Sequence, residues 1–441
     1  MVVTVLMTRA KLSRSRMRLK SQVRFWRRVG WATTRLSLTV LEFKAYGKPQ
    51  QFSAIDEAVR TVQFIRNQAI RYWMDNQGTG QNDLQKLCAQ LAKEFPFAAE
   101  LNSMARQASA ERAWSAISRF YENCKKGIPG KKGFPSFKKN NRSVEYKTSG
   151  WKLDSNRKAI TFTDKKGIGR LKLKGTRDLH FYPIEQIKRV RLVKRADGYY
   201  VQFCIRVERT EFVEPSGRAI GLDVGLKEFY TDSNGETVGN PRHLRKSESR
   251  LKQSQRTVSR RKKGGQNRAK VKVVLGKRHL KISRQRKDLA VKLARCVIQS
   301  NDLVAYEDLR IRNMVRNHSL AKSISDASWY QFRVWLEYLG KVFGKSTIAV
   351  PPHRTSQECS RCGVIVQKTL STRTHVCRCG CVMDRDYNAA RNILSRGLST
   401  VGHTGTLALD ASNASGESTS TLAGAILSEQ VGSLSEESPS L

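Results

Sequence analysis

Three carboxylates stand on separate segments of the sequence, two of them on runs that are otherwise apolar. Asp223 lies inside one apolar run, Glu307 ends another, and Asp386 opens the last expected helix. Burying an ionised carboxylate is costly unless a cation or a hydrogen-bond donor meets it. Carboxylate oxygens are the ligands that Mg²⁺ and Mn²⁺ prefer, and two such ions ~3.5–4 Å apart promote phosphodiester hydrolysis by activating water. Gathered at one sheet edge, the three acids would form a hydrolytic site for nucleic acid. Each acid taken singly fits a structural role at least as well as a catalytic one.

Five cysteines crowd into a short polar stretch towards the C-terminal end. Two residues separate Cys359 from Cys362, a spacing that lets both sulfurs reach one tetrahedral Zn²⁺. We predict that Cys359, Cys362, Cys377 and Cys379 bind a structural zinc ion, with Cys381 as a substitute for either member of the second pair. Redox or nucleophilic use is not expected, because four thiolates around zinc leave no open position.

A basic segment over residues 125–139 contains aromatic residues and is kept irregular by glycine and proline. In one interpretation, its ammonium groups contact the phosphates of a nucleic acid and its two phenylalanines stack on the bases. The equally weighted alternative is a solvated linker whose phenylalanines pack back onto the preceding domain. The candidate nucleic-acid contacts are Lys131, Lys132, Phe134, Phe137 and Lys138.

The charge of the chain points to a polyanionic partner. Its 82 lysines and arginines outnumber 37 aspartates and glutamates, giving a formal net charge of +45 that attracts nucleic acid over long range. Charge alone does not separate a nucleic-acid enzyme from a non-specific binding protein. No run approaches the ~18 apolar residues that a membrane span requires, so no membrane partner is expected. The other cysteines lie singly, which excludes a secreted disulfide framework and indicates a reduced compartment.

The two ends of the chain differ in composition from the rest. Residues 1–34 are basic and contain no acidic residue, which fits a basic arm, or a start codon placed upstream of the real one, better than an organellar transit peptide. Beyond Arg396 there is no lysine or arginine, and residues 399–441 are predicted to be disordered.

Between these ends, changes of hydrophobic period predict the elements that must position the candidate residues. One strand over 36–46 precedes three helices, the first of which is expected to begin near Ser53 as its N-cap. Residues 140–212 change to the period of strands, and the early strand is expected to join them, so that the helices form an insertion. After residue 213, apolar strands alternate with very basic helices, as in a mixed α/β domain.

Four motifs, in this order, resemble the TnpB (OrfB) proteins of bacterial insertion sequences, which are relatives of the type V CRISPR effectors. They are Gly221-Leu222-Asp223-Val224-Gly225, Tyr306-Glu307-Asp308-Leu309, Thr355 to Gly363, and Asp384 to Ile393. The resemblance is motif-specific over 216–397 and extends only to the order of domains over 36–212. It implies that Asp223, Glu307 and Asp386 are the catalytic carboxylates, whereas the residues by themselves leave Asp384 open in place of Asp386. The basic N-terminus, the shortened second cysteine pair and the long tail depart from the family pattern.

The resemblance implies a multidomain α+β protein. Its fold class is expected to be an N-terminal antiparallel β-barrel (wedge) with an inserted helical domain, followed by an RNase H-like (RuvC) α/β nuclease domain with an inserted zinc ribbon. The expected boundaries are 1–34 for a basic N-terminal arm, 35–52 for the first strand of the wedge β-barrel, 53–139 for the helical recognition domain, 140–212 for the wedge β-barrel, 213–355 for the RuvC-like nuclease domain, 356–381 for the zinc ribbon, 382–398 for the RuvC-like C-terminal helix and 399–441 for a disordered tail.

In function, the resemblance implies an RNA-guided DNA endonuclease of a transposable element that hydrolyses phosphodiesters with Mg²⁺ or Mn²⁺ and carries structural Zn²⁺. The expected partners are a guide RNA from the transposon end and a double-stranded DNA target. A separate transposase is a further partner that the sequence leaves open. The sequence also leaves open whether the protein is a monomer or a dimer. The expected location is the bacterial cytoplasm, at the nucleoid. Three alternatives stay open: a strand-transferring transposase, a catalytically silent RNA- or DNA-binding regulator, and a nuclease that needs no RNA.

Overall fold

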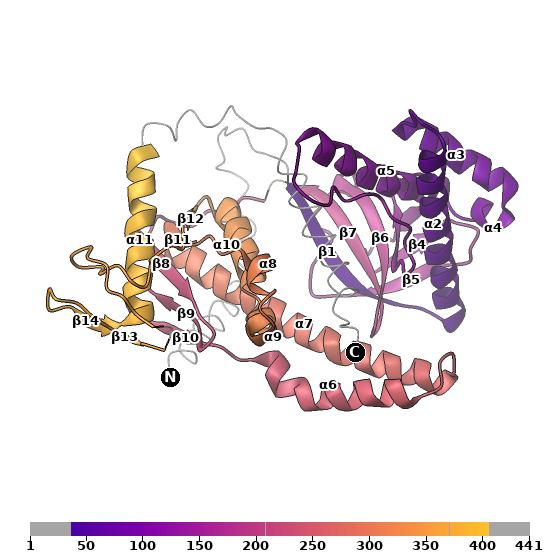
Figure 1. Ribbon diagram of the computed structural model, residues 1–441. Helices are drawn as coiled ribbons and strands as arrows, with labels where there is room; N and C mark the ends of the chain where they lie inside the picture. The colour runs from indigo at the N-terminus through magenta and orange to yellow at the C-terminus, as the bar shows by residue number, and fades with distance from the viewer. Residues whose placement is uncertain (1–36, 208, 370, 405–441) are drawn as a thin grey trace. The chain divides into compact units, whose positions relative to one another are not determined.

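The computed structural model of the chain describes residues 37–207, 209–369 and 371–404 (Figure 1). These residues form two compact units, one up to residue 209 and the other from residue 210 onward. The arm expected over 1–34 and most of the tail expected over 399–441 lie outside the described residues. Within the described ranges, no helix combines the length and the apolar character needed to cross a membrane.

The first unit is built on a seven-stranded antiparallel sheet of order β2-β6-β7-β1-β5-β4-β3. Its strands are β1 (Ser37–Tyr46), β2 (Ser143–Tyr146), β3 (Trp151–Leu153), β4 (Ala159–Phe162), β5 (Gly169–Lys174), β6 (Ile187–Arg195) and β7 (Gly198–Val207). The first strand pairs with β7 on one side and β5 on the other, so it joins the later sheet as expected. Because β2 and β3 stand at opposite edges, the expected barrel is an open sheet curled into a half-barrel (Figure 1).

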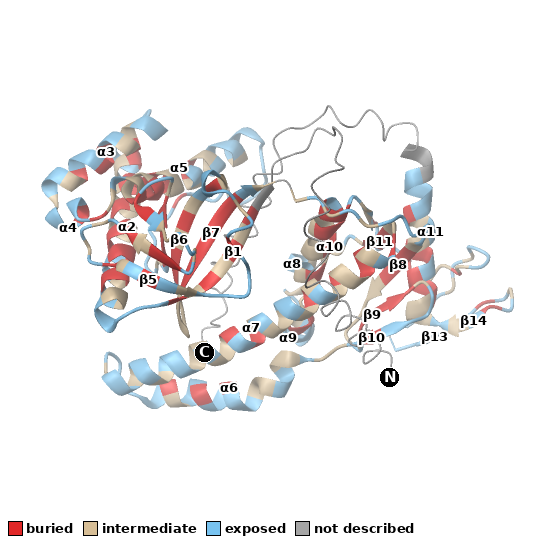
Figure 2. Cartoon of the chain, turned by 180° about the vertical axis from the view of Figure 1, so that it is seen from behind, coloured by how far each residue is buried: buried red, intermediate tan, exposed pale blue. Residues whose placement is uncertain are grey.

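Four helices are inserted between β1 and β2. They are α2 (Pro49–Asp75), α3 (Gln81–Glu94), α4 (Pro96–Ala99) and α5 (Ser103–Lys125). The prediction that Ser53 caps the first helix was wrong, because α2 begins at Pro49 with Lys48 as its N-cap. Proline suits the first helical position, since it has no N–H to leave unpaired and its φ is already helical. Apolar residues of the helices and of the sheet form one buried core (Figure 2).

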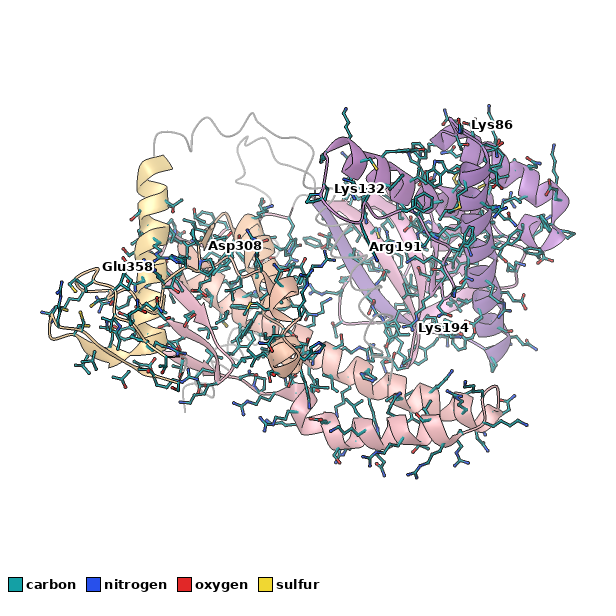
Figure 3. All side chains as sticks on the ribbon, viewed as in Figure 1. Lys86, Lys132, Arg191, Lys194, Asp308 and Glu358 are labelled. Atoms are coloured by element: carbon teal, nitrogen blue, oxygen red, sulfur yellow. The ribbon has the colours of Figure 1, made fainter. Side chains whose placement is uncertain are left out.

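A buried carboxylate on β2 joins the inserted helices to the sheet. The side chain of Glu145 is 1% exposed and pairs with Arg112 of α5 at 3.3 Å, with Arg189 of β6 at 2.6 Å and with Arg191, labelled in Figure 3. Burial by itself would raise the pKa of Glu145, but the three guanidinium groups outweigh it and lower this pKa to about 2. Neither β2 nor this ion-pair cluster was predicted from the sequence.

Replacing Glu145 by glutamine is expected to lower the free energy of unfolding at neutral pH by about 3 kcal/mol, because the surrounding guanidinium groups lose their counter-charge. The folded pKa lies below the ordinary value of 4.5, so this contribution is fully present above that pH and is lost as the pH falls towards 2. Urea unfolding of both proteins at neutral pH and at a pH well below 4.5 measures the difference in free energy of unfolding, which should decrease at the lower pH.

The exposed Glu57 of α2 provides the control for that measurement. Its carboxylate lies 3.9 Å from Arg60 at the surface, so Glu57→Gln is expected to change the free energy of unfolding by less than about 0.5 kcal/mol. A Glu145→Gln protein as stable as the Glu57→Gln protein at neutral pH would contradict the proposed contribution of the cluster.

The second unit contains a five-stranded sheet of order β10-β9-β8-β11-β12. Its strands are β8 (Ala219–Val224), β9 (Glu228–Asp232), β10 (Thr237–Gly239), β11 (Leu303–Glu307) and β12 (Ser346–Val350). β8, β9 and β10 are antiparallel neighbours, whereas β8, β11 and β12 run parallel. The helices of this unit are α6 (His243–Arg260), α7 (Gln266–Ser300), α8 (Ile311–Met314), α9 (His318–Ala327), α10 (Trp329–Phe343) and α11 (Arg385–Thr404).

Side chains alternate between the two faces of this mixed sheet. Leu222 of β8 and Tyr306 of β11 are buried in one core with residues of α7 and α10. Their neighbours Gly221 and Ala305 belong to the opposite face, where α11 packs. Because strand residues alternate with a period of two, Asp223 also belongs to the face that α11 covers.

Two glycines allow α11 to approach the sheet closely. A Cβ atom on Gly221 would lie 2.2 Å from the carbonyl oxygen of Ala390, and one on Gly397 would lie 2.5 Å from the Cβ of Ala305. Either substitution would force the helix away from the sheet, since these neighbours are fixed backbone or a short side chain. The closeness of this packing sets where the first turn of α11 lies relative to β8 and β11.

The boundaries around α11 differ from those expected. Residues 382–384, expected to start the last helix, form strand β14 (Val382–Asp384), which pairs with β13 (Thr374–Val376). The helix begins at Arg385 and runs to Thr404, so residues 399–404, expected to be disordered, are helical. Composition does not reveal this extension, because packing on the sheet nucleates the helix and each further residue then adds a hydrogen bond.

Candidate functional site

The three predicted carboxylates come from β8, β11 and α11. Leu222 of β8 pairs in parallel register with Tyr306 of β11, and Asp223 and Glu307 each follow that pair by one residue. Both acids therefore lie at the same end of two adjacent strands, on the face that α11 covers. Asp386 stands in the first turn of α11. The fold thus places Glu307 and Asp386 near enough for their charges to act on Asp223, although among the described residues only the four cysteines lie close enough to one another to form a metal-binding group as they stand.

The charges of these acids act on one another. Burial, and then the charges of Glu307 and Asp386, raise the pKa of Asp223 well above its ordinary value, while Arg385 opposes the shift. Burial also raises the pKa of Glu307, against the effect of a hydrogen bond from Thr355. Among the residues that the structure describes, no hydrogen bond reaches the Asp223 carboxylate. A divalent cation relieves such repulsion between buried acids, so this set of oxygen donors fits Mg²⁺ or Mn²⁺.

Asp384 and Asp386 have different surroundings. Asp384 is exposed, and its Oδ1 accepts hydrogen bonds from the backbone N–H groups of Asp386 (2.8 Å) and Tyr387 (3.2 Å), so it caps the N-terminus of α11. The Asp386 carboxylate instead pairs with Arg385 at 3.2 Å and Arg373 at 3.3 Å. These contacts give Asp384 a capping role, and of the two acids Asp386 raises the pKa of Asp223 more.

Three side chains that were given no role from the sequence donate hydrogen bonds to the carboxylates. The hydroxyl of Thr355 donates to Oε1 of Glu307 at 2.6 Å, and Arg373 and Arg385 donate to the two oxygens of Asp386. Thr355 and Arg385 belong to the motifs that resemble the TnpB family, so the sequence could have indicated a role for both residues. Arg373 lies outside them, so only the fold reveals it.

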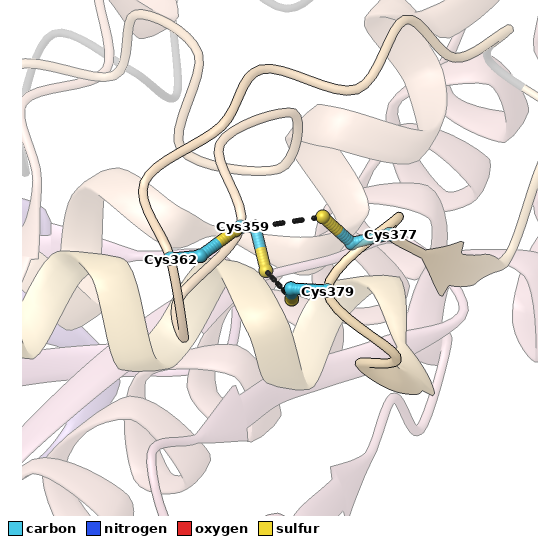
Figure 4. Close-up of side chains that lie close together, drawn as sticks. All are labelled: Cys359, Cys362, Cys377 and Cys379. Carbon is cyan, nitrogen blue, oxygen red and sulfur yellow. Dashed lines mark hydrogen bonds between the residues drawn. The ribbon is translucent and has the colours of Figure 1, made fainter.

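The four cysteines predicted to bind zinc lie together (Figure 4). The sulfur atoms of Cys359, Cys362, Cys377 and Cys379 are all within 4.8 Å of one another. Two of the sulfur pairs are closer, with 3.5 Å between Cys362 and Cys377 and 3.8 Å between Cys359 and Cys379. Four thiols at this separation suit one tetrahedral Zn²⁺. The fifth thiol, of Cys381, is buried next to this cluster but does not belong to it.

The backbone around Cys359 favours thiolate, the form that binds metal, whereas the neighbouring cysteine side chains raise the pKa of Cys362 to about 12. Burial by itself would raise the pKa of Cys359, but backbone N–H groups of Arg361 and Cys362, with the imidazole of His375, lower it to about 5. Thiolates are the zinc-binding species, so the local chain conformation supports the donor set independently of the cysteine spacing.

The two phenylalanines of the basic segment have different surroundings. The ring of Phe134 lies 5.4 Å from that of Trp73 on α2, although 59% of the residue stays exposed. Phe137 is 46% exposed. The ring contact favours the linker interpretation for Phe134, whereas Phe137 makes no ring contact with an aromatic residue in the part of the chain that the structure describes.

Two of the three candidate lysines of the same segment make hydrogen bonds. Lys131 and Lys138 are exposed, and the ammonium group of Lys132, labelled in Figure 3, donates to the carbonyl oxygen of Ile128. The backbone N–H and C=O of Lys138 exchange hydrogen bonds of 2.9 Å with the side chain of Asn67 on α2. The segment is thus fastened to the inserted helices while two of its three candidate lysines remain exposed.

Two family models match the chain. The OrfB model, described as "Probable transposase", matches residues 202–318. A second model, described as "Cas12f1-like, TNB domain", matches residues 329–393. The first match contains Asp223 and Glu307, and the second contains Asp386 and the cysteine cluster.

Curated relatives match over parts of their length. The chain is 40% identical over 182 residues to "Putative RNA-guided DNA endonuclease" of Streptomyces pristinaespiralis, which covers 41% of this chain and 45% of that protein. It is 28% identical over 282 residues to "Putative RNA-guided DNA endonuclease InsQ" of Escherichia coli (strain K12), covering 60% and 68%. It is 26% identical over 219 residues to a TnpB-like protein of Acanthamoeba polyphaga mimivirus, covering 45% and 41%. The chain therefore spans less than half the length of the first of these relatives.

Among solved structures, the chain is similar to the protein in a Cas12f1-sgRNA-target DNA complex studied by cryo-EM. The sequence identity is 14%, the match covers 79% of this chain and 83% of that chain, and the TM-score is 0.48.

Proposed function

The chain belongs to the TnpB (OrfB) family, and from that premise we propose that it is an RNA-guided DNA endonuclease that hydrolyses phosphodiesters at Asp223, Glu307 and Asp386. The observation that supports the proposal is the placement of these acids on two adjacent parallel strands and one helix, where burial and then the charges of Glu307 and Asp386 raise the pKa of Asp223. Acids that repel one another destabilise the folded chain, and a divalent cation bound between them would offset this repulsion.

The finer assignment of the fold is part of the same proposal. The half-barrel of the first unit corresponds to the wedge, and its inserted helices to the recognition domain. The mixed sheet with α11 corresponds to the RNase H-like (RuvC) nuclease core, and the residues around the four cysteines, through β14, to an inserted zinc ribbon. The order of these elements along the chain supports this assignment, because it follows the domain order that the four motifs imply.

In the proposed mechanism, Asp223, Glu307 and Asp386 would hold Mg²⁺ or Mn²⁺, which when bound would supply Lewis acidity for the activation of water and for the charge of the reacting phosphate. The residues of the chain supply its positioning. Asp223 presents oxygens that no donor within the described ranges reaches, and Thr355 holds one oxygen of Glu307. Arg373 and Arg385 hold Asp386 at the start of α11 and add positive charge where a phosphate would approach.

The proposed partners are a guide RNA and a double-stranded DNA target. The net charge of +45 favours both, and the basic segment supplies candidate contacts in Lys131, Lys132, Phe134, Phe137 and Lys138. Of these, Phe137 and the exposed lysines are the better candidates for nucleic-acid contact, since the ring of Phe134 already packs against that of Trp73. A metal-dependent cut made at a site chosen by RNA pairing is the activity that combines these partners with the carboxylate cluster.

The decisive experiment purifies the full chain after expression with its native flanking DNA and without nuclease treatment. Any copurifying RNA is sequenced, and a linear duplex that matches its variable end is offered with Mg²⁺. We expect cleavage of the matching duplex only, with free ends and no joined products. Joined products would indicate a strand transferase, cleavage without copurifying RNA would indicate an RNA-independent nuclease, and RNA binding without cleavage would indicate a regulator; each would overturn the proposal.

The roles of the two neighbouring aspartates can be separated by matched substitutions. Asp386→Asn is expected to lower the cleavage rate at least about 100-fold, because a neutral amide is a poor ligand for Mg²⁺. Asp384→Asn is expected to change it less than about threefold, since asparagine caps a helix as well as aspartate does. Single-turnover cleavage of the matching duplex measures both, and the reverse order of effects would make Asp384 the ligand.

A further inference from the structure

One face of α11 fastens the chain segment that leads from β12 into the cysteine cluster. Asn388 and Asn392 are one helical turn apart and both buried. The amide of Asn388 donates to the carbonyl oxygen of Glu358 at 2.7 Å and accepts the backbone N–H of Ser360 at 2.9 Å. The amide of Asn392 donates to the carbonyl oxygens of Glu358 (2.7 Å) and Thr355 (2.8 Å). The two amides thus fix the backbone on both sides of Glu358.

A third residue of the same face completes this attachment. The guanidinium of Arg396, one further turn along α11, pairs with the Glu358 carboxylate at 2.7 Å. It also donates to the carbonyl oxygens of Pro351 and His353, at 3.0 Å and 2.8 Å. The segment from Pro351 to Ser360 is therefore held by side chains of α11 at each end and in its middle, immediately before the first pair of cysteines.

The fastened segment delivers one hydroxyl group to the carboxylate site. Thr355 is 5% exposed, and its Oγ1 donates to Oε1 of Glu307 at 2.6 Å. A hydroxyl has one proton to donate, and the carbonyl oxygen of Pro352 lies further away, at 3.3 Å. The short bond holds one oxygen of Glu307 and so restrains the direction in which the carboxylate can present its remaining lone pairs to a cation. Such outer hydrogen bonds orient metal ligands and raise their affinity.

We propose that Thr355 is a positioning residue for Glu307, and that Asn392 places Thr355 through its backbone carbonyl. This inference rests on the proposed function, because it assigns Glu307 to a divalent-metal site. The same α11 that carries Asp386 then also sets the orientation of Glu307, through Asn392 and Thr355. Two of the three carboxylates are aligned by one helix, which packs directly against the strands that bear Asp223 and Glu307.

The test measures binding of Mn²⁺ alone to the full chain in the absence of nucleic acid, by the loss of the free-ion electron paramagnetic resonance signal. Thr355→Val removes the hydroxyl and keeps the shape; it is expected to weaken Mn²⁺ binding about 10- to 100-fold. Thr355→Ser keeps the hydroxyl and is expected to stay within about threefold of the unchanged protein. Thr257→Val is the matched control, since the Thr257 hydroxyl donates to the backbone carbonyl of Gln253 in its own helix.

Zinc content and the thermal unfolding midpoint are measured on the same samples, and we expect neither to change in Thr355→Val. Cleavage by this variant should recover as the Mn²⁺ concentration rises, because a misplaced ligand weakens metal binding without removing the site. A loss of zinc or of folded protein in Thr355→Val, together with normal Mn²⁺ binding in the fraction that stays folded, would overturn the inference and make the hydroxyl a support of the cysteine cluster.

Asp223→Asn separates failure of this inference from failure of the proposed function. If Asp223→Asn loses Mn²⁺ binding while Thr355→Val binds as the unchanged protein does, Thr355 is not a positioning residue and the metal site stands. If Asp223→Asn also binds Mn²⁺ normally, the acids do not hold the metal, and the proposed function fails with the inference.

Discussion

Asparagine in place of Asp223 is expected to lower the rate of DNA cleavage by about 1000-fold or more while leaving RNA binding unchanged. Asp223 is the acid whose ordinary charged state the fold opposes most clearly, since burial, Glu307 and Asp386 all raise its pKa. The charged form of Asp223 therefore destabilises the metal-free fold, and a bound cation would offset this loss of stability. Single-turnover cleavage with saturating guide RNA measures the rate, and filter binding measures RNA affinity.

The same substitution should make the metal-free protein more stable. A folded pKa above the ordinary value means that the charged form is disfavoured in the folded state, so removing the charge at neutral pH is expected to raise the free energy of unfolding by about 1 kcal/mol or more. Urea unfolding in the presence of a chelator selective for magnesium and calcium over zinc measures this. A structural carboxylate would give the opposite sign, with a loss of stability on replacement.

Asp308 supplies the matched control for both measurements. It follows Glu307 directly, is 55% exposed in its side chain and pairs with Arg333 at the surface. Asp308→Asn is therefore expected to change stability by less than about 1 kcal/mol and to keep cleavage near that of the unchanged protein. Loss of cleavage in Asp308→Asn equal to that in Asp223→Asn would show that charge in this region, and not ligation at Asp223, controls the reaction.

Removal of one zinc ligand is the second substitution with a large expected effect. Cys359→Ser should reduce bound zinc from about one equivalent per chain to near zero, since structural zinc sites need all four ligands and supply folding energy outright. Asn388 and Asn392 tie the backbone around this knuckle to α11, so its loss should also displace the start of the helix and abolish cleavage. Elemental analysis of the purified chain and single-turnover cleavage measure the two effects.

Cys381→Ser is the matched control, because the fifth thiol is buried beside the cluster without belonging to it. This variant is expected to keep about one zinc per chain and most of its cleavage activity. If instead Cys381→Ser loses zinc and Cys379→Ser retains it, Cys381 replaces Cys379 as a ligand, and the grouping of sulfur atoms would have to change on metal binding.

The sequence by itself determined the features that depend on local pattern. Apolar runs and their period located the strands that carry Asp223 and Glu307, because burial of one or both faces of a strand leaves its mark on consecutive residues. The first cysteine spacing predicted a metal knuckle for the same reason, since both ligands belong to one turn of chain. The start of α2 was misplaced, because Ser53 has the chemistry of an N-cap while Pro49 begins the helix.

Tertiary structure decided what depends on residues that are distant in the sequence. It separated Asp384, which caps α11, from Asp386, which pairs with Arg373 and Arg385, although the two acids look alike in the sequence. It brought Thr355 to Glu307, and it paired Glu145 with arginines of another strand and of a helix. Such contacts join residues that have no regular separation in the sequence. The energies of these contacts depend on burial and on neighbouring charges, which are set only when the chain is folded.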